Sequence, residues 1–312
     1  FIVVPNGLGN YVLNYIRWFD HIVTDLACVR FIDIHPGDDE FDTATIFQER
    51  VNDINNAIKS AQHESDTSGN FFSGQIDKSK TGCLGHSDGA VACLIAKKGS
   101  QYYGVEGNRK IKFVVALDGE YWQLPYADMK GFDFPYLGLN SENELAYTNP
   151  IRVRTASTNE NTEHIWVPGT VHQHFQINDC ALSKLARNTG AVANSDGWAW
   201  EDEWSVNWCV PDSYLPNDLK PFTHAEDFYN INTFWLRTWL NGYVDGDKVS
   251  KDTFNPLVVK VLQNHNFLGA PFKHFGPEKC GNCNYATTSA IEINRYSHFY
   301  GFYGSSASSS YY

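Results

Sequence analysis

Residues 82–98 read GCLGHSDGAVACLIAKK, and the five residues Gly85-His86-Ser87-Asp88-Gly89 within this stretch fit the pattern G-x-S-x-G. An apolar run precedes the pattern, and a run compatible with a helix follows it. A strand, a sharp turn and a helix in this order are typical of a nucleophile elbow, in which the turn holds a serine in a strained conformation. Glycines on both sides allow the chain to pack closely around that turn. The pattern therefore predicts that Ser87 is a nucleophile.

Short apolar runs recur along the chain and alternate with helical or mixed segments. These strand-like runs cover residues 1–4, 28–34, 81–85, 111–117, 134–139 and 163–168. Alternating strands and helices imply crossover connections and a mostly parallel sheet flanked by helices. Together with the elbow, this order predicts an α/β-hydrolase fold over residues 1–268. Residues 269–312 are expected to form a C-terminal extension with a flexible, Ser-rich end.

The longest predicted helix follows a capping box. Thr45 and Gln48 have the spacing at which a helix N-cap and its third helical residue satisfy each other's backbone N–H groups. Phe47, Val51 and Ile54 then recur at helical spacing. We therefore expect Thr45 to be the N-cap of an amphipathic helix.

Composition excludes some classes of protein. The 312 residues carry a net charge of −12 at pH 7, which argues against a nucleic-acid partner held through phosphate contacts. Hydrophobic residues make up 42% of the chain, which is enough for a substantial core. No apolar run reaches about 18 residues, so no membrane-spanning helix is predicted.

Seven cysteines allow up to three disulfides, whose connectivity a sequence does not reveal. Cys83 and Cys93 lie among apolar residues and are expected to be buried thiols. Cys280 and Cys283 form a C-x-x-C pair, for which a disulfide is the favoured interpretation and two plain thiols are the alternative. A single pair is at most half of a zinc site, so we predict neither a metal site nor a cofactor.

A serine nucleophile needs an imidazole as a base, and that imidazole needs a carboxylate to orient it. In this fold class the chain order is serine, acid, histidine. The candidate histidines are therefore His172 and His174, which follow the strand at 163–168. His164 lies inside that strand and is expected to be packed.

The acid is expected at the end of a strand that follows Ser87. Asp118 ends the run 111–117, and Glu142 and Glu144 follow the run 134–139. Spacing alone leaves Asp118 and Glu144 about equally favoured.

Backbone N–H groups should stabilise the oxyanion of a tetrahedral intermediate. One donor is expected to be Asp88, the residue after the nucleophile, and the second should come from the loop 6–9, after the first strand.

Five short motifs, taken together and in order, resemble the platelet-activating factor acetylhydrolases of the plasma and type II kind, also called lipoprotein-associated phospholipase A2. The segments that carry the resemblance are Asn6-Gly7-Leu8-Gly9 (the family's HGLG oxyanion loop), Gly85-His86-Ser87-Asp88-Gly89 (GHSFGG), Ala116-Leu117-Asp118 (ALD), Asn140-Ser141-Glu142 (NSE) and Gly169-Thr170-Val171-His172-Gln173-His174-Phe175 (GSVHQNF). The resemblance runs from residue 1 to about 190 and returns near 226–268.

The resemblance implies a complete set of site residues. It favours Asp118 as the acid and His172 as the base, and it implies that Leu8 and Asp88 donate the oxyanion-hole N–H groups. The family needs no calcium and removes short or oxidised sn-2 acyl chains from phospholipids. We therefore expect a phospholipid or other acyl-ester substrate, contact with a membrane or lipoprotein surface, and no nucleic-acid partner. We expect a secreted or extracellular location, with a cytoplasmic one as the alternative.

The chain also departs from that family. Asp88 replaces an aromatic residue, and its carboxylate is expected either to repel an anionic head group or to point into solvent. The family's first strands and a membrane-touching helix have no counterpart before Phe1, so N-terminal strands are expected to be missing. Residues 193–222 look like an insertion after the catalytic histidine.

This insertion contains tryptophans among acidic residues. Trp198 and Trp200 are candidate substrate-binding residues in a lid, and a packed wall over the sheet edge is the alternative. The function expected is that of a serine ester hydrolase. A carboxylesterase or polyester hydrolase acting on other acyl esters and a non-catalytic binding module on the same fold are the alternatives.

Overall fold

The structure is a computed structural model that describes residues 1–5, 15, 18, 29–32, 43–119, 121, 124–141, 150–167, 175, 225–265 and 272–275. Residues 1–278 form one compact unit, and residues 279–312 form a second unit that is outside the described residues. The predicted insertion 193–222, the C-x-x-C pair and the Ser-rich end are also outside the described residues.

Seven strands form the central sheet, in the spatial order β2-β1-β3-β6-β7-β8-β9. Their bounds are β1 Ile2–Pro5, β2 Val29–Ile32, β3 Gly82–His86, β6 Phe113–Leu117, β7 Tyr136–Ser141, β8 Thr162–Val167 and β9 Lys273–Phe275. The first six pair in parallel, and β9 is antiparallel to β8. The predicted mostly parallel sheet is confirmed, and each of the six expected strands is present. A two-stranded sheet, β4 Gly99–Ser100 with β5 Val105–Glu106, follows the elbow helix.

Strand β9 lies beyond residue 268, where the sequence placed the end of the hydrolase domain. It pairs with β8 through the register His164↔Phe275 and Ile165↔His274. A strand of three residues is too short to leave a periodic pattern in the sequence. The sheet therefore extends past the expected boundary.

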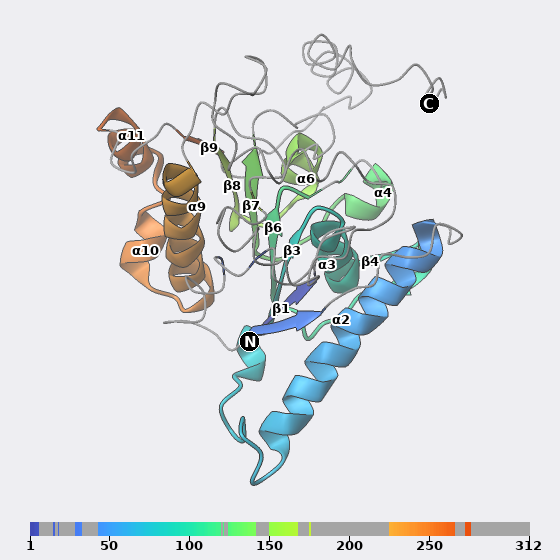
Figure 1. Cartoon of the computed structure of the whole chain (residues 1–312). Helices are drawn as coiled ribbons and strands as arrows, with labels where there is room; N and C mark the ends of the chain where they lie inside the picture. The colour runs from blue at the N-terminus through green and yellow to red at the C-terminus, as the bar shows by residue number, and fades with distance from the viewer. Residues whose placement is uncertain are drawn as a thin grey trace, which may run out of the picture. The chain divides into compact units, whose positions relative to one another are not determined.

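Helices flank the sheet on both faces (Figure 1). The α-helices are α2 Thr43–Asp66, α3 Asp88–Lys98, α4 Tyr126–Met129, α6 Pro150–Ala156, α9 Ala225–Trp239, α10 Lys248–Asp252 and α11 Pro256–Asn264. The short 3-10 helix η2 covers Lys78–Lys80, and the π-helix η6 covers Leu240–Val244.

Two apolar layers hold the sheet between these helices. Successive strand side chains point to opposite faces. Val114 and Ala116 of β6 accordingly pack in the layer that contains α2 and α3, whereas Val115 and Leu117 pack in the layer that contains α9. Burial on both faces explains why the strands are continuous apolar runs rather than alternating ones.

Helix α2 begins earlier than its capping box predicts. Thr43 and Ala44 are already helical, so Thr45 lies inside the helix and the N-cap prediction is wrong. The Gln48 side chain donates to the carbonyl of Tyr103 at 2.7 Å instead of reaching back to an N-cap. The hydrogen bond to Tyr103, which is distant in the sequence, takes the place of the expected bond within the first turn of the helix.

Cys83 and Cys93 form a disulfide, so the prediction of two buried thiols is wrong in its chemistry. Both residues are fully buried, as expected. Cys83 lies on β3 and Cys93 on α3, and their Cα atoms are 5.5 Å apart. The disulfide therefore joins the strand and the helix on either side of Ser87. Sequence separation could not reveal this pairing, because it depends on how the helix folds back onto the strand.

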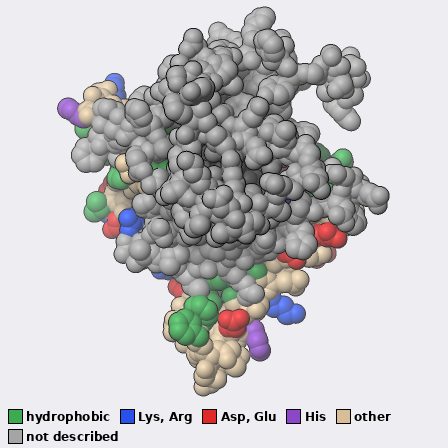
Figure 2. Space-filling model, viewed as in Figure 1, with side chains coloured by type: hydrophobic (Ala, Val, Ile, Leu, Met, Phe, Trp, Pro, Cys, Tyr) green, Lys and Arg blue, Asp and Glu red, His purple; other side chains and the backbone are tan. Residues whose placement is uncertain are grey.

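No helix in the described ranges is both long and apolar enough to cross a membrane. On the part of the surface that Figure 2 colours by side-chain type, hydrophobic, acidic and basic groups lie interspersed.

Candidate active site at the carboxyl ends of β3 and β6

Ser87 occupies a sharp turn between β3 and α3. Its backbone angles are φ 56° and ψ −127°, a conformation that residues with a side chain rarely adopt. A Cβ atom on Gly85 would lie 2.3 Å from the carbonyl carbon of Gly89, so only glycine fits at position 85. These features match the predicted strand–turn–helix geometry. The turn directs the chain straight from a buried strand into a buried helix, with Ser87 at the junction.

Asp118 lies at the end of the neighbouring strand, at the same level as Ser87. The parallel register pairs Gly85 with Ala116 and His86 with Leu117, so the next residues along the two strands are Ser87 and Asp118. The Ser87 N–H also donates to the Leu117 carbonyl at 3.0 Å. The structure therefore brings these two predicted catalytic residues together at the carboxyl ends of two neighbouring strands.

The Asp118 carboxylate is fully buried and is held by residues at the end of β7. Its Oδ1 accepts the Ser141 backbone N–H at 3.0 Å and the Asn140 side-chain amide at 3.4 Å. Its Oδ2 accepts the Ser141 hydroxyl. These three donors fix the orientation of the carboxylate. Such a carboxylate can orient an imidazole.

Ser87 and Asp118 share one further property. Among the described residues they are the two non-glycine residues with positive φ, at 56° and 47°. Backbone strain of this kind persists only where the surrounding structure enforces it, and it clusters at functional sites.

His86, the residue before the nucleophile, is buried in an aromatic cluster. Its Nδ1 lies 2.9 Å from the Tyr15 hydroxyl, and its ring stacks against Phe175 with 6.0 Å between centroids. The Trp18 indole N–H donates to the Phe175 carbonyl at 2.9 Å. The cluster fixes position 175 beside the elbow, and sequence reasoning did not identify its role.

Asp88 does not point into solvent, so the second of its two expected placements is wrong. The residue is 5% exposed, and its Oδ2 lies 3.3 Å from Nη1 of Arg50 on α2. The buried cation compensates the carboxylate. Sequence analysis did not identify Arg50, although a charge at a core-facing helical position was a usable signal.

Several predicted site residues are outside the described residues, and their assignments stay predictions. They are Leu8, Glu142, Glu144, His172, His174, Trp198 and Trp200.

His164 is fully buried in β8, as predicted. Burial, with smaller contributions from Arg154 and His274, lowers the pKa of His164 to about 3. The Nδ1 atom of this neutral imidazole lies 3.4 Å from Oδ1 of Asn140, the residue whose amide contacts Asp118.

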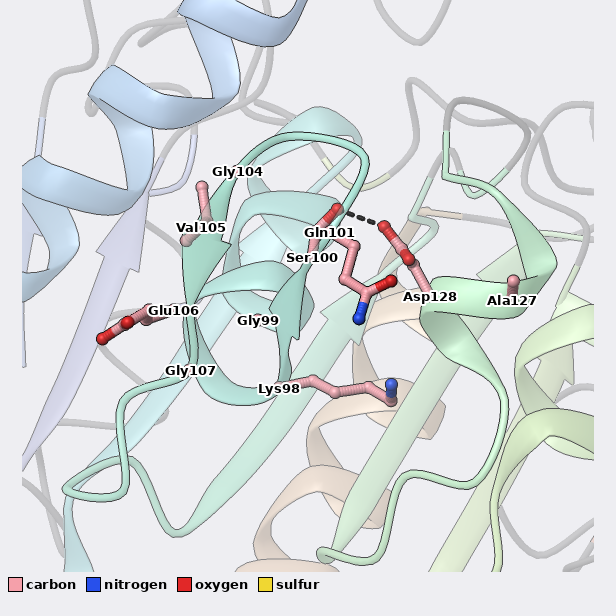
Figure 3. Close-up of a pocket in the computed structure, with 10 residues that line it drawn as sticks. All are labelled: Lys98, Gly99, Ser100, Gln101, Gly104, Val105, Glu106, Gly107, Ala127 and Asp128. Carbon is pink, nitrogen blue, oxygen red and sulfur yellow. Dashed lines mark hydrogen bonds between the residues drawn. The ribbon is translucent and has the colours of Figure 1, made fainter.

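A polar pocket of about 570 Å³ lies at the other end of α3 (Figure 3). Its lining includes Lys98, Ser100, Glu106 and Asp128, and the Ser100 hydroxyl donates to the Asp128 carboxylate. Helix α3 has 11 residues, which separates its two ends by roughly 16 Å. The pocket is therefore not the site of Ser87. No group of three His, Cys, Asp or Glu residues that could hold a metal ion occurs in the described ranges.

Comparison with protein-family sequence profiles finds no match, and comparison with curated proteins finds none. Solved structures do match. One of them is a ferulic acid esterase from Streptomyces cinnamoneus, with a TM-score of 0.53 over 82% of this chain and 69% of that one, at 15% identity. The fold is an α/β-hydrolase fold. This confirms the predicted fold class, and at 15% identity the likeness shows the fold alone.

Proposed function

We propose that this protein is a serine ester hydrolase in which Ser87 is the nucleophile, His172 the general base and Asp118 the residue that orients His172. The observation that carries the proposal is the pair of strained residues, Ser87 and Asp118, in register at the ends of β3 and β6. The oxyanion would be held by the backbone N–H groups of Asp88 and Leu8.

The reaction follows from these roles. His172 takes the hydroxyl proton as Ser87 Oγ attacks the ester carbonyl, and the tetrahedral oxyanion forms. The intermediate collapses to an acyl-enzyme when His172 returns the proton to the departing alcohol. Water, activated by the same imidazole, then attacks the acyl-enzyme and releases the carboxylic acid. Asp118 accepts the other imidazole N–H and stabilises the imidazolium.

The position of Phe175 supports a base from the segment that contains both candidate histidines. Phe175 contacts His86, which immediately precedes Ser87. His172 and His174 precede Phe175 by three residues and by one residue in the sequence, and the motif resemblance favours His172.

For the substrate we propose a short or oxidised acyl chain at the sn-2 position of a phospholipid, which the motif resemblance supports. The second candidate is a carboxylesterase acting on other acyl esters. A structural neighbour named as a ferulic acid esterase favours that alternative. Trp198 and Trp200 are proposed to contact the acyl chain or a lipid surface.

A disulfide such as Cys83–Cys93 persists mainly in oxidising compartments, which supports a secreted or extracellular location as part of the proposal. No metal or cofactor is needed for the proposed steps, because backbone N–H groups stabilise the oxyanion.

The proposal is tested by covalent labelling and hydrolysis. A fluorophosphonate probe should label the wild type and not Ser87→Ala, and Ser87→Ala should lose several orders of magnitude in kcat. Parallel assays on p-nitrophenyl acetate, methyl ferulate and sn-2 acetyl and long-acyl phospholipids would separate the two substrate classes. A wild type that neither takes up the label nor hydrolyses any ester would instead support a non-catalytic binding module.

A further inference from the structure

Arg50 is a charged residue at a core-facing position of α2. It follows Phe47 by three residues and precedes Ile54 by four, and both of those side chains are buried in the layer between α2 and the sheet. Arg50 itself is 1% exposed. Arginine is almost never fully buried unless it is paired, so the partner of Arg50 indicates the role of its charge.

That partner is Asp88. The Arg50 Nη1 atom lies 3.3 Å from Asp88 Oδ2, and both side chains are buried. Nη1 and Nε of Arg50 make no hydrogen bond, so the contact is an ion pair without the two-pronged hydrogen bonding that arginine usually offers. The Phe47 ring lies 5.7 Å from the guanidinium carbon and covers the cation from within the same helix.

The location of this pair beside Ser87 gives it a consequence for catalysis. In the proposed reaction, negative charge develops next to the N–H of Asp88. A buried, uncompensated carboxylate on that same residue would oppose the charge, because interactions between charges are strong where water is excluded. A nearby buried cation removes the opposition.

We propose that Arg50 is a positioning residue that acts through Asp88. It compensates the buried carboxylate beside the oxyanion hole and holds the first residue of α3 against α2. This inference rests on the proposed function. The alternative is that the pair only ties α2 to α3 and affects stability alone.

The test is a double-mutant cycle on p-nitrophenyl acetate, with the unfolding midpoint measured for every variant. Arg50→Met removes the cation beside the Asp88 carboxylate and should lower kcat on the order of 10²-fold, comparable to the loss of one oxyanion-hole donor, with a smaller change in KM. The double variant Arg50→Met/Asp88→Asn removes both charges and should recover at least about tenfold of that loss. Arg50→Lys keeps a cation and should stay at least about tenfold above Arg50→Met in kcat.

Ile54→Val is the matched control, because Ile54 is buried one turn further along the same face of α2. It should lower the unfolding midpoint and leave kcat unchanged when assayed well below that midpoint. A double variant no more active than Arg50→Met, or an Arg50→Met variant that behaves like Ile54→Val, would overturn the inference. Arg50→Gln replaces Arg50→Met in the cycle if the latter does not fold. An inactive, unlabelled wild type would instead refute the proposed function, so the two failures are distinguishable.

Discussion

At the scale of single residues, the proposed site depends on the Asp118 carboxylate, whose hydrogen-bond donors lie at the end of the neighbouring strand β7. If Asp118 orients His172, Asp118→Asn should lower kcat roughly 10⁴-fold by favouring the wrong imidazole tautomer. The measurement is kcat on a soluble ester, with labelling by a fluorophosphonate as a second readout. Glu144→Gln is the comparison, and it should have little effect. A large loss in Glu144→Gln with a mild effect at Asp118 would assign the acid to Glu144.

Ser141, which appears in the sequence only as part of the motif Asn140-Ser141-Glu142, holds the carboxylate of the proposed acid. Its hydroxyl and backbone N–H both donate to Asp118, and Ser141→Ala removes the hydroxyl alone. A hydrogen bond to a charged group contributes about 1.5–3 kcal/mol, so kcat should fall roughly tenfold or more. Ser157→Ala is the matched control, because Ser157 is buried and bonds Thr162 away from the site. Ser157→Ala should lower the stability of the protein without changing kcat. Equal kcat values in the two variants would show that Ser141 does not position Asp118 for catalysis.

At the scale of elements, the strand and the helix around Ser87 are joined by the Cys83–Cys93 disulfide. It closes a loop with a sequence separation of 10, and a cross-link of that length contributes about 3 kcal/mol by restricting the unfolded chain. Cys83→Ala/Cys93→Ala should therefore lose about that much free energy of unfolding in urea. Alkylation of the denatured, unreduced wild type should leave Cys83 and Cys93 unmodified. Alkylation of both, with equal stability of the wild type and the double variant, would mean that they are thiols.

At the scale of the whole molecule, the buried histidine of β8 couples folding to pH. The pKa of His164 is about 3 in the folded protein, below the 6.5 of a free imidazole, so the unfolded state binds the proton first. Stability should fall as the pH drops from about 6.5 towards 3, by up to about 1.4 kcal/mol per pH unit. Between pH 7.5 and 5.0, the free energy of unfolding of His164→Asn should therefore fall by about 2 kcal/mol less than that of the wild type.

Local chemistry was enough to predict part of this protein from its sequence. The strand–turn–helix around Ser87, the six parallel strands and the candidate acid Asp118 all depend on patterns a few residues long: apolar runs, flanking glycines and a carboxylate at a strand end. These patterns act before any long-range contact forms, so they can be recognised in a single sequence. The fold class followed from their order along the chain.

Only the tertiary structure decided which distant groups meet. The approach of α2 to α3 pairs Arg50 with Asp88, and the return of α3 onto β3 joins Cys83 to Cys93. The register of β6 with β7 sets Asp118 level with Asn140, so that Asn140 and the next residue, Ser141, both reach its carboxylate. None of these contacts leaves a periodic signal, since each joins residues on different elements. Packing of the buried layers selects them, and that packing exists only in the folded chain.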